Sequence, residues 1–291
     1  MKLLVLGADG QLGRELSQMC AQRGLAATFC RRSDCDVGER AQVAAAFDAT
    51  NPTVVINAAA YTNVDMAETE PKLAYRANHE GPANLALVSA SRRIPLIHVS
   101  TDYVFDGSKV GPYLEIDPVA PLGIYGLSKE AGEREVRKIQ EWHVIVRTAW
   151  VYGRFGRNFL KTMLDLAKAR ESWGVVNDQI GTPTASQDLA LAVLAAARQA
   201  EAGVAKWGTY HFAGPGEATW YDFAMEILDA QRGFSERRPS VVAITTEDYP
   251  TPARRPRNSR LNSDLFASTF GVRAAPWRDR VVETVGVLAR S

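Results

Sequence analysis

Short aliphatic runs alternate with longer amphipathic segments through the first half of the chain. Runs typical of buried strands occupy residues 2–6, 26–30, 54–57, 95–100 and 144–147. Between them, helical patterns extend from a glycine-rich turn to about residue 23, and over 43–49, 73–92 and 128–141. Strands that alternate with helices predict βαβ units. We therefore predict an α/β fold built on a doubly wound parallel sheet.

The pattern becomes less regular after about residue 153. Helical patterns cover 159–170, 187–199 and 220–232, a short strand is predicted at 210–212, and the Pro- and Arg-rich residues 249–260 are predicted to form loops. We predict a Rossmann domain over residues 1–153, with some later segments returning to it, and a smaller C-terminal α/β domain over 154–291. Because no flexible linker separates the two, the second domain should pack on the sheet and close a cleft.

Composition narrows the class of protein. The 291 residues carry a formal net charge of +1, which disfavours electrostatic binding to nucleic acid or to a membrane surface. The three cysteines, Cys20, Cys30 and Cys35, contain no CxxC pair, so reduced thiols are expected. The first apolar run ends at Gly7, and residues 189–197 fall far short of the ~20 residues of a membrane span. We expect a cytoplasmic protein that is neither secreted nor membrane-spanning.

Gly7, Gly10 and Gly13 follow the first predicted strand and open the first predicted helix. A tight turn in this position lets the backbone approach a pyrophosphate, and the helix N-terminus offers free N–H groups and the positive end of its dipole. The spacing differs by one residue from the usual G-x-G-x-x-G pattern, and such a turn can also serve only to pack a helix on a strand. The strand–turn–helix context favours dinucleotide binding.

The end of the second predicted strand bears on the choice between NAD and NADP. An acidic residue there binds the ribose 2′-hydroxyl, whereas arginine accommodates a 2′-phosphate. Here Arg31 and Arg32 precede Ser33, and a guanidinium fork matches phosphate geometry. NADP(H) is therefore predicted, NADH is left open, and a solvated basic turn is the structural alternative. Asp36 and Val37 suit the adenine edge and the adenine ring.

Tyr125 and Lys129 lie four residues apart at the start of a predicted helix, so both side chains share one face. An ammonium beside a phenol lowers the phenol's pKa, and the tyrosine can then exchange a proton with a substrate oxygen. The pair also arises by chance on many helices. It gains weight from Thr101, which follows the fourth predicted strand at the sheet edge where ligands collect.

Seven motifs spread over the chain carry a family resemblance. They occupy residues 7–13, 57–65, 100–107, 125–129, 147–153, 178–184 and 255–261. In this order they resemble the extended short-chain dehydrogenase/reductases, and among them the dTDP-4-dehydrorhamnose reductase family, nearly end to end. The resemblance implies reduction of the C4 keto group of dTDP-4-dehydro-β-L-rhamnose by NADPH to dTDP-β-L-rhamnose, the final step of dTDP-L-rhamnose biosynthesis.

The same resemblance implies a role for each matching residue. Tyr125 would donate the proton, Lys129 would lower the pKa of Tyr125 and bind the nicotinamide ribose, and Thr101 would position the keto oxygen. The cofactor would also contact the glycine turn, including Gly10, Gln11 and Leu12, and the residues after the third strand, Ala58, Ala59, Ala60, Tyr61 and Thr62. The nucleotide sugar would contact Val64, Thr101, Asp102, Tyr125, Trp150, Gln179 and Thr182.

Two features of the family pattern are incomplete here. Members can bind magnesium through glutamates at a subunit contact; Glu15 matches one such position and Asp188 falls near another. The resemblance thus allows magnesium and a homodimer without requiring either, and solvated helix charges are the alternative. The arginines at 254, 255, 257 and 260 could meet the nucleotide diphosphate or solvate the tail.

Two other functions stay open at this point. One is a related nucleotide-sugar 4-ketoreductase or epimerase; an epimerase would retain NAD, which Arg31 and Arg32 disfavour. The other is a non-catalytic NADP-binding subunit that resembles the regulatory subunit of methionine adenosyltransferase. A binding module has no need for a proton donor beside the nicotinamide, so the set of Thr101, Tyr125 and Lys129 favours the enzyme.

Overall fold

A parallel six-stranded sheet forms the centre of the computed structural model, which describes residues 1–290. Its strands are β1 (Lys2–Leu6), β2 (Ala26–Cys30), β3 (Val54–Asn57), β4 (Leu96–Thr101), β5 (His143–Thr148) and β10 (Gly208–His211). Their order is β10-β5-β4-β3-β1-β2, and every pairing is parallel. The predicted doubly wound α/β fold is confirmed, and each predicted strand agrees with the observed one to within about two residues.

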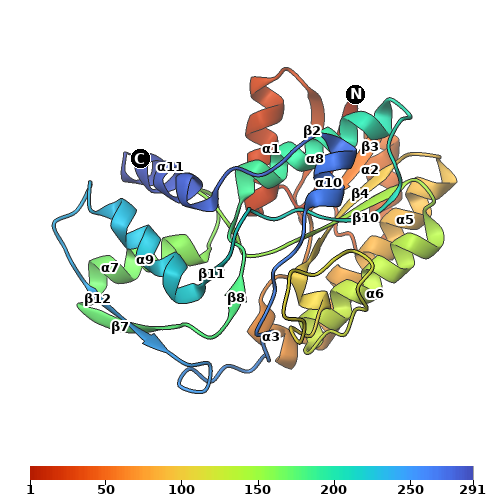
Figure 1. Ribbon diagram of the computed structural model, residues 1–291. Helices are drawn as coiled ribbons and strands as arrows, with labels where there is room; N and C mark the ends of the chain where they lie inside the picture. The colour runs from red at the N-terminus through yellow and green to blue at the C-terminus, as the bar shows by residue number, and fades with distance from the viewer. Residues whose placement is uncertain (291) are drawn as a thin grey trace.

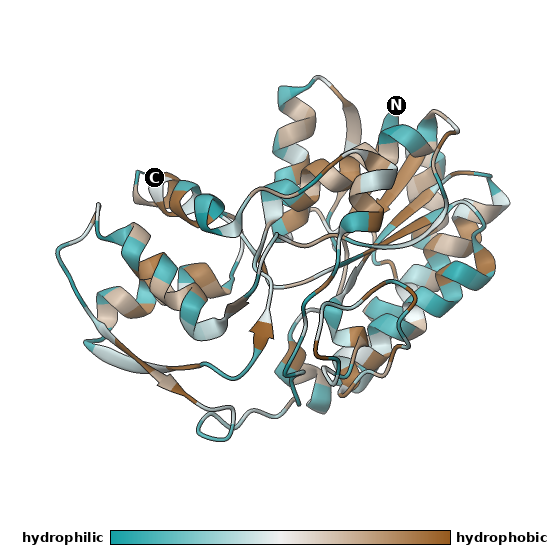
Figure 2. Cartoon of the chain, in the orientation of Figure 1, coloured by the Kyte–Doolittle hydropathy of each residue, from teal (hydrophilic) through white to brown (hydrophobic). Residues whose placement is uncertain are grey.

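Helices cover both faces of this sheet (Figure 1). Leu3 and Val5 of β1 face one hydrophobic cluster with α1 (Gln11–Gln22), α8 (Ser186–Glu201) and α10 (Asp264–Phe270). Leu4 and Leu6 face the opposite cluster, formed with α2 (Arg40–Thr50), α5 (Gly81–Ser91) and α6 (Ile124–Ile139). Strands buried on both faces read as continuous apolar runs, and Figure 2 shows these strands as the hydrophobic centre of the sheet.

Chain order reverses at β1, which lies between β2 and β3. The connections after β1 and β3 therefore leave the sheet in opposite directions and open a crevice at the carboxyl ends of these two strands. The segments that follow β1 and β3 begin at Gly7 and Ala58. This topology brings the glycine turn against residues 58–62.

The long helix predicted over 73–92 is interrupted. The segment consists of α4 (Pro71–Tyr75), a π-helical turn η1 (Arg76–Glu80) and α5. Pro82, at the start of α5, has no N–H to donate to the carbonyl oxygen of Asn78. A Cβ added at Gly132 of α6 would lie 2.0 Å from that same carbonyl oxygen. The π-helical turn η1 therefore lies where Pro82 removes one helical hydrogen bond and where α6 approaches closely.

A second cluster of elements lies to the left of the sheet in Figure 1. It contains α7 (Phe159–Ala169), α9 (Trp220–Gln231), α11 (Trp277–Ala289) and a parallel ribbon of β7 (Ser172–Val176) and β12 (Ser240–Ile244). Two short ribbons connect this region to the rest: β6 (Val151–Tyr152) with β9 (Thr184–Ala185), and β8 (Ile180–Gly181) with β11 (Ala218–Thr219). Although α8, β10 and α10 lie after residue 153, β10 is an edge strand of the large sheet, and α8 and α10 pack against that sheet. The domain boundary at residue 153 stays a prediction.

The remaining elements are short. α3 (Val64–Thr69) follows the loop after β3, and a 3-10 turn, η2 (Asp102–Val104), follows β4. Residues 249–260 form loops as predicted, with an isolated bridge between Asn258 and Ile180. Between residues 1 and 290, no helix has the length and apolar character needed to cross a bilayer.

Candidate active site

The glycine turn fits closely against the end of β3. Gly7 has φ of +87°, and a Cβ there would lie 2.6 Å from the carbonyl carbon of Ala58. A Cβ on Gly13 would lie 2.2 Å from the carbonyl oxygen of Gly7. Gly10 is the N-cap of α1 and provides no side-chain acceptor. The first N–H groups of α1 are thus left available to an anion at the helix N-terminus.

Beside this turn lies a cavity of about 220 Å³. Predicted cofactor residues that line it are Gly7, Gly10, Arg32, Asp36, Val37, Ala58, Ala59, Ala60 and Tyr61. The other predicted cofactor residues lie outside its lining. The side chain of Leu12 is buried in the core, that of Arg31 is exposed and 3.6 Å from Asp9, and Thr62 is exposed. Gln11 accepts a hydrogen bond from Asn158.

Arg76, which the sequence analysis did not identify, also lines this cavity. Its guanidinium lies 3.2 Å from Asp36 and 2.6 Å from Glu39. Burial alone would raise the pKa of Asp36, but the backbone N–H of Gly38 and the Arg76 guanidinium hold that pKa below its ordinary value. Asp36 is therefore ionised and fixed at the edge of the cavity. No local motif marks Arg76, because it comes from a helix forty residues further along the chain.

A buried amide ties the wall of this cavity to the helix that carries Tyr125. Asn78 accepts a hydrogen bond from the N–H of Tyr61 at 2.8 Å and donates to the carbonyl oxygen of Tyr61 at 3.0 Å. It also donates to Ser128 Oγ at 3.1 Å. Asn78 lies in the polar stretch Arg76–Glu80, so the surrounding sequence contains no signal of a buried amide. Through Asn78, the loop after β3 and the start of α6 keep a fixed relation.

Thr101, Tyr125 and Lys129 meet at the carboxyl end of β4. The hydroxyl of Thr101 hydrogen-bonds to Tyr125 and donates to Asp102 at 2.9 Å. Lys129 Nζ donates to the carbonyl oxygen of Val99 at 2.7 Å. Of the three side chains singled out as catalytic, Thr101 and Tyr125 are thus in contact, and Lys129 bonds to the same strand two residues before Thr101. This strand pairs with β3.

The pKa of Tyr125 differs from the expected direction. Burial raises it to about 12, and the charge of Asp102 adds to this, while the Thr101 hydroxyl opposes it. Burial lowers the pKa of Lys129 to about 8, opposed by the charge of Glu133. The predicted net lowering of the Tyr125 pKa is wrong for the protein alone, because the prediction left out desolvation. A protonated phenol at neutral pH is nevertheless the form that donates a proton.

Asp102 gives a pH-dependent prediction for stability. Burial raises its pKa to about 7, against hydrogen bonds from Thr101 and Ser259. A carboxyl whose folded pKa is raised stabilises the fold below its unfolded pKa, and this contribution is lost as the pH rises through about 7. We expect Asp102→Asn to gain about 2–3 kcal/mol in free energy of unfolding over the native protein between pH 5 and pH 8. Urea unfolding at both pH values measures the gain.

Asp106→Asn is the matched control. The backbone N–H of Ser108 and the hydroxyl of Tyr113 lower the pKa of Asp106, so its contribution is present above the unfolded pKa and constant from pH 5 to pH 8. A similar pH-dependent gain in both variants would contradict the assignment to Asp102.

Trp150 has a strained backbone conformation in the short connection between β5 and β6. Its φ is +45°, a conformation rare for a bulky side chain. The indole stacks on Trp220 at 3.5 Å and donates to Ser259 Oγ at 3.0 Å. A Cβ on Gly181 would lie 2.3 Å from the same ring. Such strain persists where surrounding contacts over-determine it, and it clusters at ligand sites.

Two further cavities meet at Tyr249, Thr251 and Arg255, which line both. One, of about 410 Å³, is lined by aromatic residues, Gln179 and Arg255; the other, of about 660 Å³, by Arg254, Arg255 and Arg257 among others. Arg255 lines both, and its guanidinium lies 2.8 Å from Asp65. The residues lining the aromatic cavity include Tyr103, Phe159, Trp173, Trp220 and Tyr249.

The remaining residues predicted to contact the substrate line neither of these two cavities. Thr182 is buried and donates to the carbonyl oxygen of Gly216. Val64 begins α3 and is partly buried. Arg260 pairs with Glu217 and lines neither of the two cavities. Among the arginines of the tail, Arg254, Arg255 and Arg257 are therefore the ones at the cleft.

Glu15 and Asp188, the two positions considered for magnesium, lie in separate ion pairs. Glu15 is 2.8 Å from Arg154, and Asp188 is 2.7 Å from Arg280. Within residues 1–290, no group of three or more His, Cys, Asp or Glu side chains is arranged to hold a metal ion. The carboxylates are thus already neutralised by arginines of the same chain.

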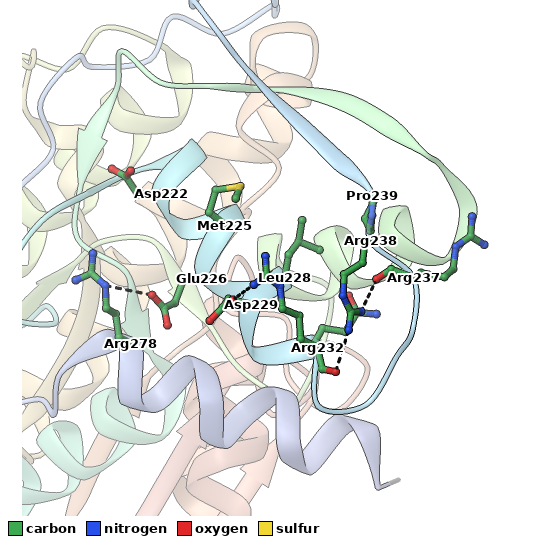
Figure 3. A pocket seen from close by; sticks show the side chains of 11 residues that line it. Asp222, Met225, Glu226, Leu228, Asp229, Arg232, Arg237, Arg238, Pro239 and Arg278 are labelled. Atoms are coloured by element: carbon green, nitrogen blue, oxygen red, sulfur yellow. Dashed lines mark hydrogen bonds and ion pairs between the residues drawn. The ribbon is translucent and has the colours of Figure 1, made fainter.

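A further cavity, of about 370 Å³, lies between α9, α11 and the segment 232–239 (Figure 3). Its arginines Arg232 and Arg278 pair with Asp229 and Glu226 of α9. None of the residues predicted for cofactor or substrate lines it. This cavity is separate from the site built at the sheet edge.

A parallel sheet with a glycine turn after β1, together with a Tyr-x-x-x-Lys pair at the start of α6, is typical of the short-chain dehydrogenase/reductase fold. The family model described as RmlD substrate binding domain matches residues 1–289. The chain belongs to this family.

Individual relatives agree over nearly the whole chain. A dTDP-4-dehydrorhamnose reductase of Aggregatibacter actinomycetemcomitans is 45% identical over 285 residues, which cover 95% of this chain and 96% of the relative. A solved dTDP-4-dehydrorhamnose reductase of Clostridium acetobutylicum superposes with a TM-score of 0.92 at 38% identity and covers 99% of both chains. The Bacillus anthracis enzyme of that name, solved in complex with NADP, has a TM-score of 0.91 at 34% identity and covers 98% and 99%.

Proposed function

We propose that this chain is an NADPH-dependent reductase of the C4 keto group of dTDP-4-dehydro-β-L-rhamnose, with dTDP-β-L-rhamnose as product. The observation that carries the proposal is the meeting of Thr101, Tyr125 and Lys129 at the end of β4, beside the cavity of the glycine turn. The names of the relatives supply the substrate. Their coverage of nearly the full chain supports the transfer.

The cavity beside the glycine turn fits a dinucleotide. Gly7 and Gly13 keep the backbone where a Cβ would not fit, the start of α1 points free N–H groups at a pyrophosphate, and Asp36 stands ionised at the adenine end. Bound NADPH supplies the hydride. Arg32 lies at the same end, 77% exposed, and would face a 2′-phosphate.

Proton transfer falls to Tyr125. With a pKa of about 12 it keeps its proton at neutral pH and can give it to the oxygen that receives negative charge as the keto group is reduced. Thr101, hydrogen-bonded to the same phenol, orients that oxygen. The Lys129 ammonium then stabilises the phenolate that forms. Asp102 and Trp150 would hold the sugar, and Arg255 the diphosphate between the two substrate-side cavities.

An assay with purified protein tests the proposal. NADPH oxidation is followed with dTDP-4-dehydro-β-L-rhamnose and with UDP- and GDP-linked 4-keto sugars, and the product is identified by mass spectrometry and NMR. Turnover restricted to the dTDP sugar is expected. Bound NAD returned unchanged would favour an epimerase. Capture of a methionine adenosyltransferase without turnover on any keto sugar would favour the regulatory subunit.

The choice of cofactor gives a further prediction. Replacing both Arg31 and Arg32 by alanine removes two exposed guanidinium groups from the 2′-phosphate end. We expect the KM for NADPH to rise about 10–100-fold, because a charge-assisted hydrogen bond contributes about 1.5–3 kcal/mol. The KM for NADH should stay nearly unchanged. Steady-state kinetics with each cofactor measure both values.

Arg23→Ala, at the opposite end of α1, is the control and should change neither KM. An equal loss for NADPH and NADH in the double variant would overturn the 2′-phosphate assignment.

The proposal also covers the location, the partners and the domain roles of the enzyme. We infer a cytoplasmic reductase whose partner is the nucleotide sugar, with no nucleic-acid or membrane partner. A homodimer stays a prediction that sedimentation would test. Residues 154–291, apart from the elements that join the large sheet, would form the substrate-binding part.

A further inference from the structure

A buried set of charges extends from Lys129 into the core. Lys129, Glu133 and Arg147 are 2%, 0% and 3% exposed. Arg147 Nε donates to Glu133 Oε1 at 2.9 Å and Nη2 donates to Oε2 at 2.7 Å. Arg137, one turn further along α6, donates to the same carboxylate at 2.8 Å. Glu133 is therefore fixed from two elements, α6 and β5.

The position of Glu133 relates it to Lys129. The two residues are four apart in α6, which puts their side chains on one face, about 5–6 Å apart at Cβ. In a fully buried site the attraction between opposite charges is screened far less than in water. The Lys129 ammonium itself donates to a neutral carbonyl, that of Val99. Glu133 is the buried carboxylate that shares this helical face with Lys129.

The surrounding groups do not replace it. On the side of the sheet, the titratable or charged groups on the neighbouring elements are His98 on β4, His143 and Arg147 on β5, Asp102 and Tyr103 on η2, and His211 on β10. The helical elements packed against α6 carry Asp65 and Glu68 on α3, Lys72 and Tyr75 on α4, and Arg76, His79 and Glu80 on η1. Burial holds the pKa of His98 well below its ordinary value, so that ring is neutral. The charge of Asp102 acts on Tyr125 and Tyr103. Glu133 is the carboxylate whose charge raises the pKa of Lys129 against burial.

We propose that Glu133, fixed by Arg147, is a positioning residue that keeps Lys129 protonated and so sets the upper pH limit of the reductase. The proposal rests on the proposed function, since it needs turnover that depends on a charged Lys129. Glu133 does not touch substrate or cofactor. Its effect on catalysis is electrostatic and passes through the ammonium.

The pH dependence of kcat/KM tests this, because it reports the essential groups of the free enzyme. In the native protein, kcat/KM for NADPH-dependent reduction should fall as the pH rises through about 8, where Lys129 loses its proton. In Glu133→Gln the neutral amide no longer favours the ammonium. The descending limb should therefore move to lower pH by about one unit or more.

Glu130→Gln is the matched control: the same substitution on the same helix, at a carboxylate that pairs with Arg134 and Arg137. Its descending limb should coincide with that of the native protein. If Glu133→Gln fails to fold, Arg147→Gln replaces it. Loss of that cation leaves the charge of Glu133 less neutralised, so the limb should move to higher pH, the opposite direction.

The outcomes separate the two proposals. No turnover by the native protein on any 4-keto sugar overturns the proposed function. Suppose instead that the native protein turns over, but the descending limb of the pH profile of kcat/KM is unchanged in the folded Glu133→Gln or Arg147→Gln variant. That result overturns the role of Glu133 alone. A general loss of structure would lower activity at every pH without moving the limb.

Discussion

Replacing Tyr125 by phenylalanine is expected to lower kcat by about 10²–10⁴-fold, the usual contribution of a positioned general acid. The ring stays in place, because it packs edge-on against Tyr103 with centroids 5.4 Å apart, and only the hydroxyl that bonds to Thr101 is lost. The Kd for NADPH should stay within about threefold of the native value, a change under 1 kcal/mol. NADPH oxidation gives kcat, and fluorescence titration gives Kd.

Tyr152→Phe is the control for removal of a buried phenol hydroxyl. Tyr152 donates to the carbonyl oxygen of Trp277 within the hydrophobic cluster formed with α7, α9 and α11, away from the cleft. The variant should lose about 0.5–1.5 kcal/mol of stability and keep kcat. If Tyr125→Phe retained native kcat, the proton-donor role would be wrong, whatever happened to NADPH affinity.

Much of the fold follows from patterns that are local in sequence. The inner strands of the large sheet are buried on both faces, so they read as apolar runs, as in Leu3–Leu6 or Val54–Ile56. The ribbon of β7 and β12 lacks this signal: β7 alternates exposed and buried residues, β12 has no buried residue, and the two strands are separated by more than sixty residues. Pairing over that distance depends on tertiary contacts, which a local pattern does not contain.

The candidate site divides in the same way. Thr101, Tyr125 and the glycine turn lie next to strand and helix ends, and the topology of a parallel sheet brings such ends to one edge. Arg76 beside Asp36, and Arg255 beside Asp65, are partners 40 and 190 residues apart. No spacing rule predicts such pairs.

The direction of the Tyr125 pKa was mispredicted for a related reason. The four-residue spacing to Lys129 is visible in the sequence, whereas burial of Lys129 and partial burial of Tyr125 are properties of the assembled core. For Tyr125, desolvation outweighs the opposing hydrogen bond from Thr101. Sequence therefore identifies the members of a site more readily than their protonation.

Replacing Gly13 by alanine is expected to weaken NADPH binding by about 100-fold or more, equivalent to about 2.7 kcal/mol. A methyl group there would lie 2.2 Å from the carbonyl oxygen of Gly7 and 2.8 Å from Cα of Ala8, both backbone atoms. The start of α1 must therefore move away from the turn, and its N–H groups leave the pyrophosphate position. Isothermal titration calorimetry with NADPH measures the loss.

Gly24→Ala, beyond the other end of α1, is the matched control: φ is +62° and nothing lies within 4 Å of the added Cβ. That variant should lose only about 1 kcal/mol of stability and keep NADPH affinity, whereas equal affinities in the two variants would show that close packing of the turn is not what positions the cofactor.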